Sequence, residues 1–360
     1  MDVKKKIMFV LPSLSGGGAE RVMLTLVKHI DKSKFVPIFV LNKKEGKLLK
    51  QLPKDIEVID LNVTQARYAI FKIAKKIKEL KPDIVFSTLG HLNLLMAMIR
   101  PFYSKKIKFI SRESNTVSLE NQNEKYPRIF NFLYKNVYNN FDLIITQSKY
   151  MKLDLVEKFG IKEDKIVTIY NPVDIENILE KREKPLVKPF KKDKINLIAI
   201  GRLAHQKGFD VLIDTMANLD DRFHLYILGE GDDEKELKNR IKTLDLSEKV
   251  TMLGFCENPY AFINESDFFI LSSRYEGLPN VVLEANACKK PCVAFDMPGG
   301  TAEIIADGKS GILVKHFSAK ALSDAIKEAV KIDFDEEYIY NFCKENFSVL
   351  KIVREYENNF

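Results

Sequence analysis

The chain alternates short apolar runs with longer amphipathic runs, and this alternation is what most limits how it can fold. Between the short runs, residues 19–30, 66–80, 126–140 and 148–159 have helical spacing. Alternation of strands and helices predicts a parallel sheet with helices on both faces. In the first half, the runs of strand length and composition lie at residues 7–11, 36–41, 83–87, 107–111, 142–146 and 166–170.

A lysine-rich segment, residues 177–194, interrupts this alternation and is predicted to be an exposed linker. We therefore expect an α/β protein with two doubly wound, Rossmann-like domains facing a central cleft, which is where such sheets bind ligands. The domains are residues 1–176 and 195–345, and a C-terminal helix over 346–360 is expected to return to the first domain. In the second half, the strand-like runs lie at 195–200, 223–228, 250–253, 268–271 and 291–295.

Chain length and hydropathy agree with two soluble domains. The 360 residues, 46% of them apolar, are enough for two hydrophobic cores. The longest strongly apolar stretch, residues 92–99, falls short of the roughly 20 residues that a membrane-spanning helix needs. The first 14 residues lack the cleavage site of a signal peptide, so we expect a cytoplasmic protein.

A glycine-rich turn follows the first strand-like run. Residues 13–21 read Ser-Leu-Ser-Gly-Gly-Gly-Ala-Glu-Arg, and amides at such a helix start attract anions. The segment is not a dinucleotide fingerprint, because Arg21 stands where the third glycine should be. A phosphate-binding turn and a simple strand-to-helix turn both fit this pattern.

Two cations lie just after the first strand-like run of the second half. Residues 201–208 read Gly-Arg-Leu-Ala-His-Gln-Lys-Gly, which places Arg202 and Lys207 on one loop. A guanidinium and an ammonium at a carboxyl strand end can hold a diphosphate. The simpler alternative is a pair of surface cations.

Two glutamates, Glu276 and Glu284, flank a helix start and form the most specific motif. Gly277 and Pro279 prevent one continuous helix, so Glu276 lies on a loop. A helix beginning near Asn280 directs its free amides towards the pocket that Glu276 enters, and Glu284 lies one turn inside.

Taken together, these motifs resemble family 4 glycosyltransferases, which have the GT-B fold. The resemblance rests on Glu276 with Glu284, on 201–208, on the turn at 16–21 and on Tyr-Asn-Pro-Val-Asp at 170–174, and it covers nearly the whole chain. Within the family, residues 13–22 and 254–260 are most similar to bacterial enzymes that extend lipid-linked oligosaccharides, including N-acetylgalactosamine transferases of protein glycosylation.

The resemblance implies a role for each motif. Arg202 and Lys207 hold the diphosphate of a sugar nucleotide, and with Glu276 they are the catalytic candidates. Glu284 accepts hydrogen bonds from the ribose and Glu276 from the transferred sugar. The donor-binding set is Gly17, Gly18, Arg202, Lys207, Glu276, Gly277, Leu278, Asn280, Val281 and Glu284.

No cofactor and no essential metal are expected. Enzymes that hold a diphosphate through Mg²⁺ often carry two aspartates separated by one residue. Asp333 and Asp335 form such a pair, but they follow a helix and lie far from any strand end, so we interpret them as a helix-boundary loop.

One segment departs from the family pattern. Many relatives carry a histidine after the fifth strand of the first domain, whereas residues 110–115 here read Ile-Ser-Arg-Glu-Ser-Asn. Arg112 or Glu113 is the acceptor-side candidate in its place. His91, after the fourth strand, is more often a capping or packing residue than a catalyst.

The preferred function is a retaining transfer of a hexose or N-acetylhexosamine from a nucleotide sugar, with uridine as the expected base, to a lipid-linked oligosaccharide or surface-polysaccharide precursor. The alternatives are a sugar-nucleotide epimerase of the same fold and a non-enzymatic nucleotide- or RNA-binding protein. Nucleic acid is not an expected partner, because the chain has no aromatic and basic RNA-binding motif.

Charge is divided unequally, which favours an anionic partner for the first domain. Residues 1–194 hold 38 Lys and Arg against 22 Asp and Glu, and 38 − 22 gives +16, whereas residues 195–360 hold 19 against 28, which gives −9. We expect this domain to rest on an anionic membrane surface at the inner face of the cell membrane. Ile70, Ile73 and Ile77 share one helical face, which either meets lipid or packs against the sheet.

Overall fold

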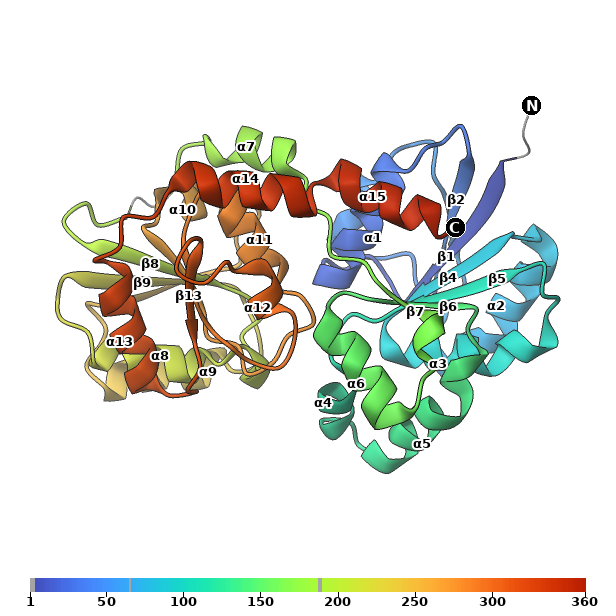
Figure 1. Ribbon diagram of the computed structural model, residues 1–360, viewed down its shortest axis with the longest axis horizontal. Coiled ribbons are helices and arrows are strands. Elements are labelled where there is room, and N and C mark those ends of the chain that lie inside the picture. The colour runs from blue at the N-terminus through green and yellow to red at the C-terminus, as the bar shows by residue number, and fades with distance from the viewer. Residues whose placement is uncertain (1–3, 65, 187–189) are drawn as a thin grey trace. The chain divides into compact units, whose positions relative to one another are not determined.

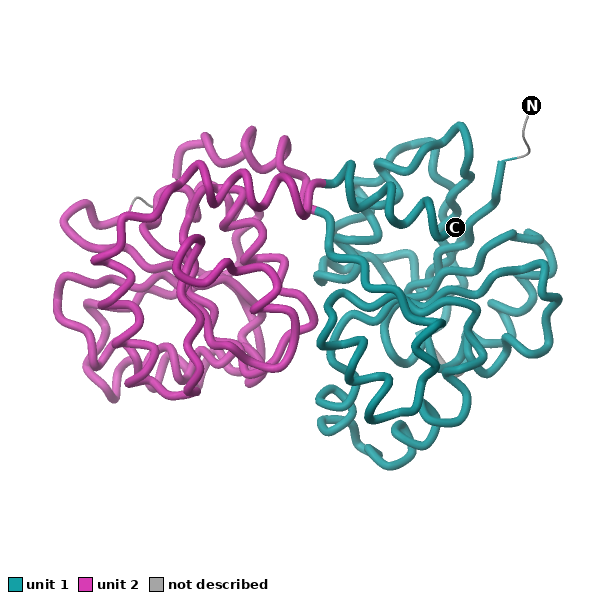
Figure 2. Tube along the Cα trace, viewed as in Figure 1, with its two compact units in different colours: residues 1–172, 349–360 teal, residues 173–348 magenta. Residues whose placement is uncertain are grey.

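The computed structural model describes residues 4–64, 66–186 and 190–360 and divides into two compact units (Figure 2). Unit 1 holds the chain up to Pro172 together with Val349–Phe360, and unit 2 is Val173–Ser348. The division therefore falls before the segment 177–194 that was expected to be a linker. The difference arises because helix α7 (Ile175–Arg182), capped by the Asp174 side chain, packs on α10 and α11 of unit 2.

Unit 1 contains a seven-stranded parallel sheet within its described residues, with strand order β3-β2-β1-β4-β5-β6-β7 (Figure 1). The central strand β1 is almost wholly buried from Ile7 to Leu11, as its continuous apolar run predicts. The strands are β1 (Lys5–Leu11), β2 (Phe35–Leu41), β3 (Glu57–Asp60), β4 (Ile84–Thr88), β5 (Lys108–Arg112), β6 (Leu143–Thr146) and β7 (Ile166–Thr168).

Helices cover both faces of this sheet. Helices α2, α3, α5 and α6 pack on the face that presents Met8 and Val10, and α1 and α15 pack on the face that presents Phe9. The helices are α1 (Gly18–His29), α2 (Ala66–Leu80), α3 (Gly90–Ile99), α4 (Val117–Gln122), α5 (Pro127–Val137), α6 (Lys149–Phe159) and α15 (Val349–Asn358), with short 3-10 turns η1 (Lys47–Gln51), η2 (Arg100–Phe102), η3 (Tyr138–Asn140) and η4 (Glu163–Lys165).

Unit 2 repeats this plan with a six-stranded parallel sheet in the part of the chain described, in the order β10-β9-β8-β11-β12-β13. The strands are β8 (Ile195–Ile200), β9 (Phe223–Leu228), β10 (Val250–Gly254), β11 (Phe268–Leu271), β12 (Cys292–Phe295) and β13 (Gly311–Val314). The remaining elements are η5 (His205–Lys207), α8 (Phe209–Ala217), α9 (Glu234–Thr243), α10 (Pro259–Glu265), α11 (Asn280–Ala287), α12 (Thr301–Ile304), α13 (Ala319–Ala329) and α14 (Glu336–Phe347).

The expected fold class, two doubly wound α/β domains, is confirmed. In each sheet the strand order reverses beside one central strand, between β1 and β4 in unit 1 and between β8 and β11 in unit 2. Ligands of such sheets bind where the loops after these two strands diverge. Over the described ranges, no helix combines the length and hydropathy needed to cross a membrane.

The isoleucines of helix α2 face the sheet. Ile73 and Ile77 are buried and Ile70 is partly buried, all in the core beneath the sheet. Of the two alternatives for this stripe, lipid contact and packing against the sheet, the structure shows the second. The stripe covers the sheet because β2 and β4 offer it an apolar surface.

Candidate active site

In unit 2, the loops after β8 and β11 bring an ammonium and a carboxylate together. Lys207 Nζ lies 2.6 Å from Glu276 Oε1, and the Ser273 hydroxyl donates to the same oxygen at 2.6 Å. Their side chains are only 22% and 10% exposed, so water screens this pair less than a surface pair. The two residues were expected at one site from motifs 69 positions apart, and the fold places them in contact.

Two glycines allow the loops to approach this closely. Gly208 has a φ of +64°, and a Cβ there would lie 2.1 Å from the carbonyl oxygen of Ser272. Gly299 has a φ of +136°, and a Cβ there would lie 2.2 Å from the carbonyl oxygen of Glu276. Any side chain at either position would push the Glu276 loop away from its neighbours.

A second ion pair, which the sequence did not indicate, ties the loop after β11 to the first turn of α8. Arg274 donates to both oxygens of Asp210 at 2.9 and 2.7 Å, and also to the His205 carbonyl at 2.7 Å. Burial alone would raise the pKa of Asp210, but the hydrogen bonds and charge of Arg274 hold it below its ordinary value. Asp210 could not be found from sequence, because it lies 64 residues from its partner and in no motif.

Helix α11 begins directly after the Glu276 loop. Gly277 and Leu278 are buried, whereas Asn280, Val281 and Glu284 are partly exposed. Asn280 is the first residue of the helix and Glu284 lies in its second turn, so both glutamates keep the positions expected of them. Arg202 is exposed on the same loop as Lys207.

In unit 1, the glycine-rich turn opens α1 as expected. Gly17 occupies the N-cap position and Gly18 is the first helical residue. The Glu20 carboxylate accepts the amides of Gly16 and Gly17, at 2.5 and 2.8 Å. The turn can thus hold an acidic group on its amides, and in this structure the group is the protein's own carboxylate.

The acceptor-side candidates lie at the end of β5 and are fully buried. Arg112 donates to the Tyr356 hydroxyl at 3.0 Å and to the Asn171 side-chain oxygen at 2.5 Å. Through Tyr356, Arg112 connects the sheet to the C-terminal helix α15. Neither Arg112 nor Glu113 reaches the surface in this structure.

The Glu113 carboxyl group is hydrogen-bonded to an amide and, within the described ranges, is not paired with a cation. Asn93 donates to its Oε1 at 2.9 Å, and Oε2 has no hydrogen-bond partner among the described residues. Burial raises the pKa of Glu113 to about 8, and the bond from Asn93 offsets only part of this rise. The group therefore carries a proton at neutral pH.

His91 lies in the first turn of α3, on the surface. Its Nε2 lies 3.0 Å from Glu124 Oε1, and its ring meets Phe130 edge-on. The histidine thus joins α3 to α5, which agrees with a packing residue.

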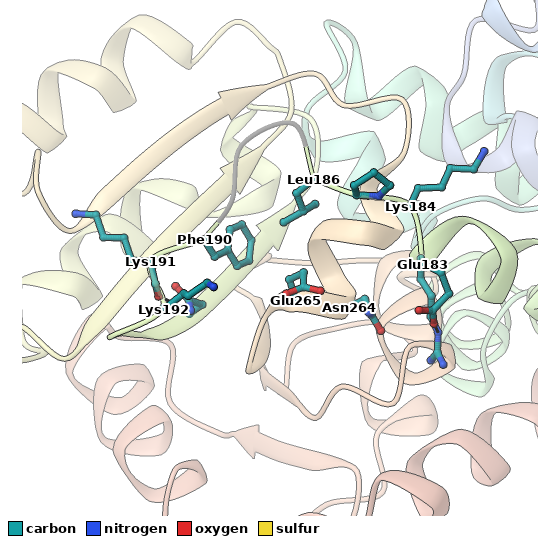
Figure 3. Close-up of a pocket in the computed structure, with 11 residues that line it drawn as sticks. Glu183, Lys184, Leu186, Phe190, Lys191, Lys192, Asn264 and Glu265 are labelled. Carbon is teal, nitrogen blue, oxygen red and sulfur yellow. Dashed lines mark hydrogen bonds and ion pairs between the residues drawn. The ribbon is translucent and has the colours of Figure 1, made fainter.

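A cavity of about 420 Å³ opens elsewhere in unit 2 (Figure 3). It is lined by residues 182–186 and 190–192, by Asn196 at the start of β8 and by Asn264 and Glu265 at the end of α10. The amino end of β8 is opposite the loop that carries Lys207, so this cavity is separate from the Lys207 and Glu276 pair.

In the described part of the chain, no three His, Cys, Asp or Glu residues gather closely enough to hold a metal ion. Asp335 caps α14 by accepting the amides of Glu337 and Tyr338, which is the helix-boundary role expected for it.

Comparison with known proteins identifies the family. The model "Glycosyltransferase Family 4" matches residues 16–177, and "Glycosyl transferases group 1" matches residues 180–344. A Campylobacter jejuni protein named N-acetylgalactosamine-N,N'-diacetylbacillosaminyl-diphospho-undecaprenol 4-alpha-N-acetylgalactosaminyltransferase is 31% identical over 98% of each chain. The chain belongs to the family 4 glycosyltransferases.

Other relatives of this glycosyltransferase agree. A second C. jejuni alpha-1,4-N-acetyl-D-galactosaminyltransferase is 26% identical over 86% of this chain and 84% of that protein. The crystal structure of Anabaena HepE with UDP and glucose has a TM-score of 0.82 at 20% identity, covering 99% of both chains, and confirms the GT-B fold. These relatives favour a transferase over the two alternatives, a sugar-nucleotide epimerase and a nucleotide- or RNA-binding protein.

Proposed function

We propose that this glycosyltransferase transfers a hexose or N-acetylhexosamine from a UDP-linked donor to a lipid-linked oligosaccharide or surface-polysaccharide precursor. The observation that carries the proposal is the Lys207 and Glu276 pair at the strand-order reversal of unit 2. The names of the C. jejuni relatives, which act on diphospho-undecaprenol carriers, support the acceptor class.

The donor's diphosphate binds the cations of the β8 loop. An ammonium has three N–H donors, so Lys207 can hold Glu276 and still donate to phosphate oxygens, and Arg202 adds a second charge. The amides at the start of α11, from Asn280 and Val281, complete the cradle together with the Gly277 and Leu278 backbone.

The two glutamates bind different parts of the donor. The Glu276 carboxylate accepts a hydrogen bond from a hydroxyl of the transferred sugar. Lys207 and Ser273 hold the carboxylate in position for this contact. Glu284, one turn into α11, accepts hydrogen bonds from the ribose hydroxyls. In unit 1, taken by itself, Gly17 and Gly18 remain donor-binding candidates, because the Gly17 amide already binds a carboxylate, that of Glu20.

Catalysis is mainly stabilisation of the leaving group. The bond between the anomeric carbon and the phosphate oxygen breaks, and the negative charge that develops on the diphosphate falls beside Lys207 and Arg202. The acceptor hydroxyl attacks on the same face and gives its proton to the departing phosphate oxygen. The transfer therefore retains configuration and needs neither a separate general base nor a metal.

Arg112 and Glu113 remain the acceptor-side candidates. Because both are buried, we assign them an indirect role, in which they shape the end of the unit 1 sheet. The same unit, with its excess of positive charge, holds the enzyme peripherally on the cytoplasmic face of the membrane, where a lipid-linked acceptor is found.

The test is transfer of radiolabelled sugar from UDP-N-acetylgalactosamine, UDP-N-acetylglucosamine, UDP-glucose and GDP-mannose to polyprenyl-diphosphate glycans, with and without EDTA. We expect label in the lipid fraction from at least one UDP sugar, unchanged by EDTA, and an α-linked product from an α-linked donor. Conversion of a donor to its epimer without transfer would show an epimerase instead. Loss of transfer in EDTA with recovery in Mg²⁺ would contradict the metal-free mechanism.

A further inference from the structure

The outward side of the helical layer that contains α2, α3 and α5 presents large apolar side chains to solvent. Phe71 on α2 is 82% exposed, Phe102 on η2 is 86% exposed and Phe132 on α5 is 64% exposed. Tyr68, Met98 and Ile129 on the same elements are also exposed. Side chains of this size are usually buried, and several together indicate an interaction surface.

These elements are neighbours in the fold, so their exposed side chains lie on the outward side of one helical layer. Helix α3 packs against α2 on one side and α5 on the other, and all three contribute to one core under the sheet (Figure 1). The Tyr103 hydroxyl donates to the Ala74 carbonyl at 3.2 Å, which fixes the η2 turn beside α2. We name the outward side of residues 68–80, 98–106 and 125–136 the outer face.

The outer face is strongly basic. Its three segments hold ten Lys and Arg residues and one acidic residue, Glu79. Arg100 is buried against Asp142, and Glu79 lies within reach of Lys75 and Lys76, so the rest of the charge is carried by lysines and Arg128 at the surface. Phenylalanines among lysines are the pattern of a surface that lies on anionic lipid.

We propose that the outer face lies on an anionic bilayer, with Phe71, Phe102 and Phe132 inserted at the headgroup boundary and the surrounding lysines on lipid phosphates. The inference deepens the proposed function, for which it supplies the surface that holds the enzyme at its lipid-linked acceptor. The isoleucines of α2 face the core, so the contact comes from the opposite side of that helix.

Charge decides between a bilayer and a second copy of this chain. A two-fold dimer through the outer face would set one basic surface against an identical one, and like charges in an interface are unfavourable. An anionic bilayer offers opposite charge over an extended plane, and each lysine near it adds attraction that salt weakens.

The test uses vesicles without donor or acceptor, so it is independent of transfer activity. The chain has no tryptophan, so Phe102→Trp gives a single tryptophan on the outer face, and Leu350→Trp gives one at an exposed position of α15, on the other side of the sheet. With phosphatidylglycerol-containing vesicles at low salt, we expect a blue shift and quenching by brominated lipid for Phe102→Trp only. Equal responses at both sites, or none, would overturn the proposal.

Two sets of substitutions separate apolar from ionic attachment. Combining Phe71→Ser, Phe102→Ser and Phe132→Ser should lower vesicle partitioning about tenfold or more, at normal folding stability because these side chains are exposed. Combining Lys75→Glu, Lys106→Glu and Lys135→Glu should abolish the dependence on anionic lipid.

The matched charge control combines Lys44→Glu, Lys50→Glu and Lys54→Glu, three exposed residues of unit 1 outside the outer face. If this control weakens binding as much as the outer-face lysine set, the attachment is diffuse and the proposal fails. A blue shift of Phe102→Trp that grows with protein concentration in the absence of vesicles would show self-association and would also overturn it.

Discussion

The two units have the same strand-order reversal in their sheets, but different polar side chains lie in the loops beyond it. In both, the strand order reverses beside a central strand, and polar side chains gather in the loops beyond. At the end of the unit 2 sheet these are partly exposed ion pairs, Lys207 with Glu276 and Arg274 with Asp210. At the end of the unit 1 sheet, Arg112 and Glu113 are buried and bonded to amides and a phenol.

Two carboxyl groups show the consequence. Asp210 has a pKa below its ordinary value because a guanidinium outweighs its burial, whereas the pKa of Glu113 rises to about 8 because it is buried against neutral amides. The strand order therefore determines where polar side chains gather. The hydrogen-bonding partner of each carboxyl group then determines whether that group is charged. The unit 2 end has partly exposed charged groups, which suit a departing diphosphate.

The largest expected effect comes from removing the unit 2 ammonium. Lys207→Ala should lower turnover by roughly two to three orders of magnitude, as for other losses of a charge stabiliser. Stability should fall by only about 1 to 3 kcal/mol, because Ser273 still donates to Glu276. The control is Lys238→Ala, which breaks an exposed 2.6 Å pair with Glu234 and should leave turnover unchanged. Near-normal turnover in Lys207→Ala would remove the proposed role.

The two glutamates should separate sugar from nucleotide. Glu276→Gln should impair transfer and leave the affinity for UDP nearly unchanged, because UDP has no sugar for Glu276 to contact. Glu284→Ala should weaken both, since its contact is with the ribose. Calorimetry with UDP and with the intact donor measures the difference, and equal loss of UDP affinity in both variants would contradict the assignment.

The Arg274 and Asp210 pair should affect activity indirectly, because it positions the loop that carries Glu276. Arg274→Ala removes three hydrogen bonds, one to the His205 carbonyl and two to Asp210 on α8, and should lower kcat/KM about tenfold, with partial rescue by Arg274→Lys. The matched control is Arg222→Ala, an exposed two-bonded pair with Asp220 in the same unit. If both variants lose the same stability and no activity, the Arg274 pair is only structural.

The last prediction concerns stability alone, at the buried carboxyl of unit 1. Glu113 binds a proton in the folded protein up to about pH 8, whereas its ordinary pKa is 4.5. Its stabilising contribution is thus full below its ordinary pKa and is lost as pH rises towards 8. Relative to Glu113→Gln, the wild type should lose on the order of 1 kcal/mol of unfolding free energy per pH unit across this range. A pH-independent difference in denaturant melts would show that Glu113 is ionised when folded.

Much of the fold could be predicted from the sequence, since the long buried strands and amphipathic helices have strong local patterns. The strand β3 was missed because its four residues are half-exposed. Helix α3 was recognised only as an apolar run, because it is buried on nearly all sides and has little periodicity. Helix α7 was taken for linker because charged residues dominate its sequence.

The sequence by itself determined the two-sheet plan and the motifs that place Lys207, Glu276 and Glu284, because these depend on spacing along the chain. Only the tertiary structure decided which groups become neighbours. Asp210 meets Arg274 across 64 residues, and Tyr356 meets Arg112 across 244. It also decided that the α2 isoleucines are buried and Phe71 is not. Burial and partners across the fold set charge state and exposure, and neither is encoded in any local stretch of sequence.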